Sequence, residues 1–183
     1  MSKNVLVPLA HGSEEMEAVI IIDILRRAGI NVKIAGEHEI VTCSRGVKMI
    51  PDIVIANLDL NEEFDAVILP GGMKGTTNLL KNEILLEILK KHSSRNGLIG
   101  AICAAPIILA EHNILKPGQK VTSHPSVKES LITYSYQEQR VIYDYGIITS
   151  RGAGTAFEFA LYLVELLAGP ETAIKIAQDI VLD

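Results

Sequence analysis

Three observations predict that this chain is an α/β protein with a mostly parallel sheet between two layers of helices. Short apolar runs alternate with helix-like stretches along nearly the whole sequence. Two of the runs, 67–69 and 98–102, are apolar at almost every position, which is typical of strands buried on both faces. The length of 183 residues and the hydrophobic content of 48% suit one core of ordinary size. We therefore expect a three-layer α/β/α sandwich forming one domain over residues 1–183, with ligands bound at the carboxyl ends of its strands.

The predicted strands are apolar runs that glycine, proline or charged residues interrupt. Pro70-Gly71-Gly72, for example, stops the run that ends at Leu69. In chain order, we expect strands at residues 5–10, 32–35, 65–69, 98–102, 119–122 and 146–149. Two pairs of runs depart from the alternation with helices and predict β-hairpins: 40–43 with 47–50, and 133–136 with 140–143.

The predicted helices combine apolar residues at three- and four-residue spacing with recognisable end signals. We expect Ser13 to cap the first helix, which has acidic residues in its first turn, and Gly29 to end it. In chain order, we expect helices at residues 14–28, 82–92 and 154–167, and two more that begin at Pro106 and Pro170.

The first of these helices carries more apolar residues than one buried face needs. Residues 18–22 read Ala-Val-Ile-Ile-Ile, whereas a helix on one side of a sheet requires a single apolar stripe. The surplus indicates either a subunit interface or cover by other parts of the same chain. We favour an oligomer.

Composition excludes several classes of protein. With 17 Lys+Arg against 22 Asp+Glu, the net charge of −5 argues against a nucleic-acid partner, which would need a basic face. The longest uncharged stretch, 96–110, contains two glycines and a proline and is too short to cross a membrane. The N-terminus lacks the apolar run of a signal peptide. We expect a soluble, cytoplasmic protein with no membrane partner, in which Cys43 and Cys103 are free thiols.

Cys103 occupies the predicted turn between the strand 98–102 and the helix that begins at Pro106. Small neighbours would let the backbone bend sharply there, and the helix N-terminus would favour a thiolate, as at a nucleophile elbow. The alternative is a small cysteine that fills core space. The sequence pattern alone favours neither the reactive thiol nor the core-filling cysteine.

Three further groups could take part in chemistry at the same sheet edge. Gly71 and Gly72 could offer N–H groups to an oxyanion, or could simply form a turn. Glu17 could turn inward and hold a proton, although a solvated helix acid is the commoner case. His124 could be a general base or a turn histidine.

No cofactor or metal is expected. The segment 71–75 lacks the Gly-Lys-Ser/Thr ending of a P-loop, and the turn at 10–15 lacks the glycine pattern of a dinucleotide site. The other histidines show no metal-ligand spacing and are assigned to the surface: His11, His38, His92 and His112.

Six motifs occur together in the order typical of one family. They are Glu14-Glu15-Met16-Glu17, Cys43-Ser44-Arg45, Leu69-Pro70-Gly71-Gly72, Ala101-Ile102-Cys103-Ala104, His124-Pro125 and Ser150-Arg151-Gly152-x-Gly154-Thr155. The sequence resembles the ThiJ/PfpI superfamily, specifically its Parkinsonism-associated deglycase (DJ-one) branch, over about residues 5–182. The resemblance implies a flavodoxin-like homodimer in which Cys103 is the nucleophile, Glu17 its protonated partner and His124 an active-site histidine.

The resemblance also assigns residues around the nucleophile. Gly71, Gly72 and Ala104 match backbone groups of an oxyanion pocket. Arg27 and Arg45 match basic residues near the site, with Arg45 facing the partner subunit, and Asp23 matches an acid that orients the histidine.

The implied function is cofactor-independent conversion of methylglyoxal and other 2-oxoaldehydes, or of their early glycation adducts, into 2-hydroxy acids such as lactate. Such an enzyme protects against carbonyl and oxidative stress. The alternative is a redox-sensing stress protein or chaperone whose Cys103 is oxidised to sulfinate, with little catalysis. Peptidase activity is disfavoured because Ala104, not histidine, follows the cysteine.

Overall fold

A computed structural model describes residues 3–182 and confirms the α/β/α sandwich with a mostly parallel sheet. The central sheet has seven strands in the order β10-β11-β7-β6-β1-β2-β5, and only β10 runs antiparallel to its neighbour. The strands are β1 Asn4–Leu9, β2 Asn31–Gly36, β5 Ile53–Val54, β6 Ala66–Leu69, β7 Leu98–Ile102, β10 Val141–Asp144 and β11 Ile147–Ser150. The interpretation of 1–183 as one domain stays a prediction, and residues 1, 2 and 183 lie outside the described part.

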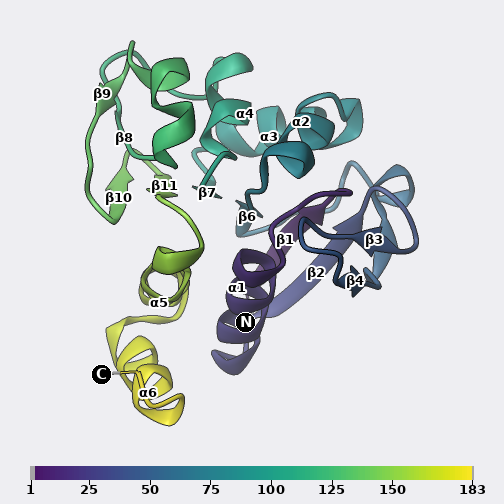
Figure 1. Cartoon of the computed structure of the whole chain (residues 1–183). Helices are drawn as coiled ribbons and strands as arrows, with labels where there is room; N and C mark the ends of the chain where they lie inside the picture. The colour runs from purple at the N-terminus through teal and green to yellow at the C-terminus, as the bar shows by residue number, and fades with distance from the viewer. Residues whose placement is uncertain (1–2, 183) are drawn as a thin grey trace.

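Helices cover both faces of this sheet, as Figure 1 shows. On one side lie α1 (Glu15–Arg27) and α5 (Ala156–Ala168), with α6 (Pro170–Asp179) packed on α5; on the other lie α2 (Met73–Leu80), α3 (Glu83–Ser94) and α4 (Pro106–Glu111). A buried apolar cluster fills the space on each side of the sheet. None of the described helices is long and apolar enough to cross a membrane.

Shorter elements connect these layers. The predicted hairpin around Gly46 is confirmed: β3 (Val41–Thr42) pairs antiparallel with β4 (Lys48–Met49), and Gly46 has a φ of +91°. β8 (Lys120–Val121) and β9 (Ser135–Tyr136) form a separate two-stranded parallel sheet. Three 3-10 helices complete the described elements: η1 Ile55–Asn57, η2 Pro125–Leu131 and η3 Ala153–Thr155.

The predicted second hairpin, 133–136 with 140–143, is wrong. β10 pairs instead with β11, through a two-residue turn in which Tyr145 and Gly146 have φ values of +46° and +79°. Positive φ at both central residues is typical of a type I′ hairpin turn, whose twist matches that of the strands. The dipeptide Tyr145-Gly146 is therefore the turn signal. It favours the pairing of β10 with β11 over the predicted pairing of 140–143 with 133–136.

The first helix differs from its prediction at its start. Ser13 does not cap α1, because its hydroxyl accepts the Ala10 N–H at 3.0 Å within the preceding turn, and Glu14 takes the cap position. Part of the surplus apolar surface packs against α5 of the same chain. Met16 and Val19 nevertheless stay 56% and 49% exposed.

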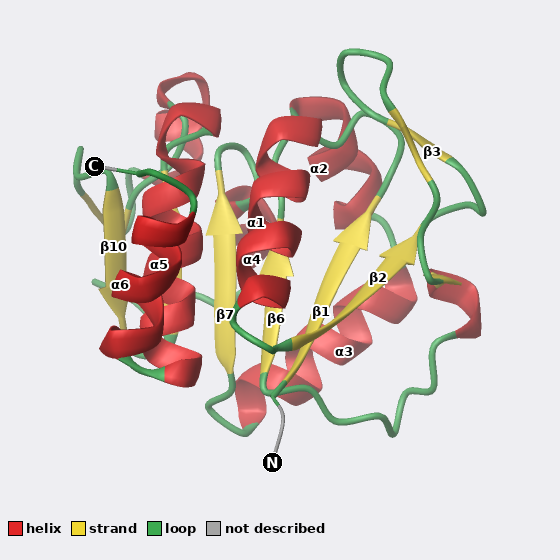
Figure 2. Ribbon diagram, turned by 90° about the horizontal axis from the view of Figure 1, so that it is seen from below, coloured by secondary structure: helices red, strands yellow, loops and turns green. Residues whose placement is uncertain are grey.

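The order of the strands determines where a ligand site forms. The chain passes from β1 outward to β2, and then returns to β6, β7 and β11 on the other side of β1. A crevice forms at such a reversal, outside the carboxyl ends of the strands. Figure 2 shows that β1, β6 and β7 point the same way, so the segments after them meet at one edge. These segments contain Gly12, Gly72 and Cys103.

We expect Phe159→Ala to lower the free energy of unfolding by about 3–5 kcal/mol. Phe159 is fully buried in the cluster between α5 and the sheet, so its removal leaves a cavity. Urea unfolding measures this change. Phe157→Ala is the matched control because Phe157 is exposed on the same helix, and its loss should cost less than about 1 kcal/mol. Equal losses in the two variants would contradict this account of the core.

Candidate active site

Cys103 lies in a strained turn between β7 and α4. Its φ of +64° is in the left-handed region, which is uncommon outside glycine and costs about 1–3 kcal/mol. Two backbone hydrogen bonds hold the turn: the Cys103 N–H donates to the Ser150 carbonyl at 3.0 Å, and the Cys103 carbonyl accepts the His124 N–H at 2.9 Å. The structure thus places the thiol at the predicted elbow, with neighbouring strands fixing the backbone.

Glu17 turns inward from the first turns of α1 and has no solvent exposure. Its Oε2 accepts the Gly71 N–H at 2.7 Å, whereas its Oε1 has no hydrogen-bond partner within residues 3–182. Burial raises the pKa of Glu17 to about 7, against the opposing effects of the Gly71 N–H and the adjacent Cys103 side chain. A carboxyl with this pKa can hold or release a proton at neutral pH.

The Cys103 thiol and the Glu17 carboxyl influence each other strongly. Burial raises the pKa of Cys103 to about 12, and a charged Glu17 adds to this rise, while the N–H groups of Gly72 and Ala104 lower it. The sequence led us to expect a helix terminus that favours the thiolate, and beside an ionised Glu17 the opposite holds. A thiolate therefore requires that Glu17 keep its proton, which removes the repulsion between two buried negative charges.

Two glycines make the close approach of these elements possible. A Cβ on Gly71 would lie 2.5 Å from the Cys103 Cβ, and one on Gly72 would lie 2.3 Å from the Gly12 carbonyl oxygen. Gly72 also has a φ of +85°. The predicted role of Gly71 in an oxyanion pocket changes, because its one N–H is used by Glu17. Gly72 and Ala104 remain as the two amides directed at the sulfur.

A cleft of about 750 Å³ opens beside the sulfur. Its walls come from the turns after β1 and β6, the β3–β4 hairpin and the loops around His124 and Ala153. The lining residues are His11, Gly12, Glu14, Glu17, Thr42, Cys43, Ser44, Arg45, Gly72, Met73, Lys74, Cys103, Ala104, His124, Ser126 and Ala153.

Hydrogen bonds to two acids fasten the hairpin to the start of α1. The Ser44 hydroxyl lies 2.6 Å from Oε2 of Glu14 and 2.7 Å from Oε2 of Glu15. Oε1 of Glu15 also accepts the N–H groups of Arg45, at 2.8 Å, and Val47. Burial opposes ionisation of Glu15, but these hydrogen bonds outweigh it and lower its pKa. The Arg45 backbone is thereby held at the cleft, which its side chain lines.

His124 borders the cleft, and its ring is held by Ser126. The imidazole Nδ1 lies 2.7 Å from the Ser126 hydroxyl and accepts the Ser126 N–H at 3.2 Å. Since Nδ1 accepts, a neutral ring carries its proton on Nε2. His124 therefore offers a hydrogen-bond donor at Nε2, whereas the sequence left open a general base or a turn histidine.

The structure does not bring Asp23 and Arg27 to the site of their own chain. Asp23 Oδ2 accepts from Arg27 Nε at 2.6 Å, in an ion pair on the exposed side of α1. Asp23 follows Glu17 by six residues, which is about 9 Å along a helix. Within residues 3–182, the His124 ring bonds to Ser126 and not to Asp23. The assigned role of Asp23 in orienting the histidine is therefore not met within one chain.

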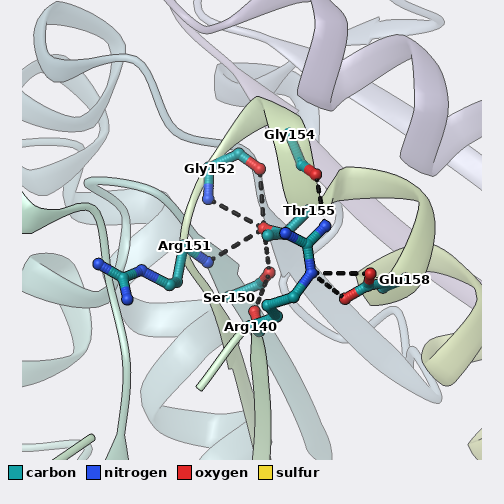
Figure 3. Close-up of polar contacts among 7 residues, drawn as sticks. All are labelled: Arg140, Ser150, Arg151, Gly152, Gly154, Thr155 and Glu158. Atoms are coloured by element: carbon teal, nitrogen blue, oxygen red, sulfur yellow. Dashed lines mark hydrogen bonds and ion pairs between the residues drawn. The ribbon is translucent and has the colours of Figure 1, made fainter. Parts of the chain in front are cut away.

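Gly152 faces the reactive groups, a role that its sequence motif does not indicate. A Cβ on Gly152 would lie 3.6 Å from the His124 ring and 4.0 Å from both the Cys103 Sγ and Glu17 Oε1. Figure 3 shows how Thr155 holds this glycine: the Thr155 hydroxyl accepts the Gly152 N–H at 3.1 Å and lies 2.6 Å from the Ser150 hydroxyl. The motif Ser150-Arg151-Gly152 was noticed in the sequence, but it had no role there.

A second layer of contacts braces the same loop. Arg140 Nε lies 2.8 Å from both carboxylate oxygens of Glu158 on α5, and its Nη2 donates to the Gly154 carbonyl at 2.8 Å. The Arg140 carbonyl in turn accepts the Ser150 hydroxyl (Figure 3). The loop after β11 is thus tied to an edge strand and to a helix.

The remaining thiol and histidines have other roles. Both cysteines are free; Cys43 is buried, and burial with nearby Glu15 raises its pKa to about 11. His92 is not at the surface as predicted: it is buried, and Nε2 lies 2.9 Å from the Leu98 carbonyl. His11 lines the cleft, where its Nδ1 accepts the Thr42 N–H at 2.9 Å. Among the described residues, no group of three or more His, Cys, Asp or Glu side chains could hold a metal ion.

This chain is similar to several known proteins over its whole length. Protein dj-1beta of Drosophila melanogaster is 45% identical, covering 100% of this chain and 98% of that protein. Its crystal structure matches with a TM-score of 0.95 and covers 100% of both chains. The Parkinson disease protein 7 homolog of Danio rerio is also 45% identical, covering 98% and 97%.

One relative carries an activity in its name. The glutathione-independent glyoxalase DJR-1.2 of Caenorhabditis elegans is 38% identical, with 99% of this chain and 96% of that protein covered. The family model of the DJ-1/PfpI family matches residues 3–166. With the flavodoxin-like sandwich, the cysteine elbow and matches that span the chain, this protein belongs to the DJ-1/PfpI family.

Proposed function

We propose that this chain is a glyoxalase that converts 2-oxoaldehydes such as methylglyoxal into 2-hydroxy acids such as lactate, without glutathione or another cofactor. The observation that carries the proposal is the buried Glu17 carboxyl, with a pKa near 7 and one free oxygen, beside the Cys103 thiol in an open cleft. Such a pair supplies both a nucleophile and a group that can move a proton. The name of the Caenorhabditis elegans relative supports the same activity.

The reaction begins when the Cys103 thiolate adds to the aldehyde carbon. The new carbon–sulfur bond gives a hemithioacetal, and its oxygen takes up the negative charge or a proton. The N–H groups of Gly72 and Ala104 point at the sulfur, so they also face an oxygen on the carbon bound to it. A protonated Glu17 is adjacent and able to donate.

The next step moves hydrogen between neighbouring carbons. Glu17 removes the proton from the former aldehyde carbon and returns one to the ketone carbon, which leaves a thioester bearing a hydroxyl. Water then cleaves the thioester, releasing the 2-hydroxy acid and the Cys103 thiol. The aldehyde carbon is oxidised and the ketone carbon reduced, so one water is consumed and no external oxidant is needed. His124 can donate from Nε2 to a substrate oxygen during these steps.

The same site could act on early glycation adducts, because these form reversibly from the same aldehydes. The alternative, in which Cys103 mainly senses oxidants, uses the same elbow. Of the two thiols, Cys103 is partly exposed in the cleft whereas Cys43 is buried. The glyoxalase and the redox sensor would therefore use the same residue, Cys103, and would differ in the product that forms.

Lactate formation from methylglyoxal tests the proposed function. We expect Cys103→Ala to abolish it, and Glu17→Gln to lower kcat by about 100-fold or more, because an amide cannot exchange the proton. The product is measured with an enzyme-coupled lactate assay on reduced protein.

Glu165→Gln is the matched control, since Glu165 is an exposed glutamate on α5, and its kcat should equal that of the wild type. Full activity in Cys103→Ala would exclude this mechanism. Absence of lactate from the wild type, together with selective oxidation of Cys103 by mild peroxide, would favour the redox alternative.

The raised pKa of Glu17 also predicts how stability depends on pH. Between about pH 4.5 and 7 the folded state binds a proton that the unfolded state has lost, so the free energy of unfolding falls as pH rises. The expected loss is about 3 kcal/mol. Urea unfolding across this range should show that Glu17→Gln removes this component.

The difference between wild type and Glu17→Gln isolates Glu17 from other titrating groups. Burial lowers the pKa of His92, which makes a contribution of the opposite sign, and this contribution is common to both proteins. Parallel pH profiles for the two proteins would show that Glu17 is not the buried titrating acid.

We further propose that the chain forms a homodimer through the exposed apolar side of α1. Met16 and Val19 lie there, and the hairpin residue Val47 is exposed close by, since its N–H reaches Glu15. Intrachain packing against α5 leaves these side chains uncovered. A second copy of the same surface would bury them.

Val19→Arg should therefore weaken dimerisation by about 100-fold or more, because it places a charge in an apolar interface. Sedimentation velocity over a concentration series measures the change. Ile174→Arg, at an exposed apolar position on α6, is the control and should leave the dimer intact. A monomeric wild type would contradict the proposed dimer.

A further inference from the structure

The mouth of the cleft carries two cations that the proposed chemistry does not use. Lys74 and Arg45 both line it, and in the described part of the chain neither head group has an ion pair or a hydrogen bond. The protein as a whole has a net charge of −5. The protein is negatively charged as a whole, yet two unpaired cations line one cleft. Cations gathered in a cleft attract anions.

Among the described residues, the acidic groups of the cleft form no ion pair with these cations. Glu14 is engaged by the Ser44 hydroxyl at 2.6 Å, and Glu17 lies at the base with its Oε2 on the Gly71 N–H. The Arg45 backbone is held by Glu15, but its side chain is exposed. Within a single chain, both cationic head groups are thus available to a molecule that enters the cleft, and Lys74 lies outside the hairpin that belongs to the proposed dimer surface.

Lys74 is held against the wall of the cleft by the shape of the turn after β1. A Cβ built on Gly12 would lie 2.6, 2.9 and 3.1 Å from the Cβ, Cγ and Cδ of Lys74. The aliphatic stem therefore lies flat along Gly12, itself a lining residue, and a side chain at position 12 would displace it. This packing limits the freedom of the stem and keeps the ammonium group near the cleft.

Lys74 is close in sequence to an amide that acts on the reacting sulfur. It lies two residues after Gly72, whose N–H points at the Cys103 sulfur. Arg45 stands on the hairpin that forms a different wall. A substrate whose aldehyde carbon is bonded to the sulfur therefore lies in the same cleft as these two cations.

The size of the cleft also indicates a substrate larger than methylglyoxal. A volume of about 750 Å³ is in the range that accommodates ligands much larger than a three-carbon aldehyde. Methylglyoxal would fill only a small part of this volume.

We propose that Lys74, with Arg45, makes the cleft selective for anionic 2-oxoaldehydes, whose aldehyde reacts at Cys103 while a carboxylate at the far end binds the two cations. The inference rests on the proposed glyoxalase function and specifies its substrate class. For 4,5-dioxopentanoate the product is 2-hydroxyglutarate: one water is added, the aldehyde carbon is oxidised and the ketone carbon is reduced. The distal carboxylate is unchanged.

The test compares two substrates of equal length that differ in charge. These are 4,5-dioxopentanoate and the uncharged 2-oxopentanal, and the quantity of interest is the ratio of their kcat/KM values. We expect the wild type to favour the carboxylate substrate about fivefold or more, with a preference that declines as sodium chloride is added. Lys74→Gln should lower the ratio about five- to tenfold, chiefly through KM, and Lys74→Arg should restore most of it.

Lys81→Gln is the matched control, because Lys81 is exposed at the other end of α2 and does not line the cleft. It should leave the ratio unchanged. A wild-type ratio at or below one, or equal effects of Lys74→Gln and Lys81→Gln, would overturn the proposed selectivity.

A binding measurement separates this inference from the function on which it rests. 4-Oxopentanoate lacks the aldehyde and cannot react, so its binding to wild type and to Lys74→Gln can be followed by calorimetry with 2-pentanone as the neutral reference. If neither aldehyde is turned over but 4-oxopentanoate binds and Lys74→Gln weakens this binding, the glyoxalase function fails and the anion site stands. If 4-oxopentanoate does not bind to the wild type, the anion site fails whatever the activity.

Discussion

The left-handed backbone of Cys103 is the constraint on which the rest of the site depends. This conformation turns the thiol back toward the end of β6, and the space there is so small that residue 71 must lack a Cβ. Gly71 in turn directs its N–H at Glu17, which fixes the carboxyl beside the sulfur. The carbonyl of Ser150 holds the Cys103 N–H from the other side. The strain at one residue is thus sustained by backbone hydrogen bonds to Ser150 of β11 and to His124.

The same turn places the Glu17 carboxyl where water cannot solvate its charge. Glu17 has one oxygen without a partner, and a buried acid in that condition favours the neutral form. A buried Leu would place neither a charge nor an unpaired polar atom there. Glu17 therefore lowers stability and lies beside a nucleophile. Residues of this kind are typical of functional sites, where activity explains why the position holds an acid. In the proposed reaction this proton is the one that the substrate exchanges.

Much of the fold could be predicted from the sequence, because buried parallel strands are continuous apolar runs and the helices between them have clear periodicity. Leu98–Ile102 was predicted at its exact bounds. The errors arose where a short turn decided the pairing: Tyr145 takes a positive φ that nothing but its position before Gly146 suggested. In the site, Cys103 could be located from its neighbours. The role of Gly152 could not, because its proximity to the sulfur depends on how Thr155 folds the loop back. Similarly, His92 is buried by Gly97 and Leu98, a tertiary contact with no periodic signature.

When Glu17 and Cys103 together hold one negative charge, backbone amides decide which of them carries it. The thiolate beside a protonated Glu17 has the same net charge as the thiol beside an ionised Glu17, so a distant cation acts almost equally on both forms. The nearby groups differ: the Gly71 N–H lowers the pKa of Glu17, whereas the N–H groups of Gly72 and Ala104 lower the pKa of Cys103. Charge recognition by the exposed cations of the cleft therefore contributes to substrate binding, while these amides govern the proton that the chemical step requires.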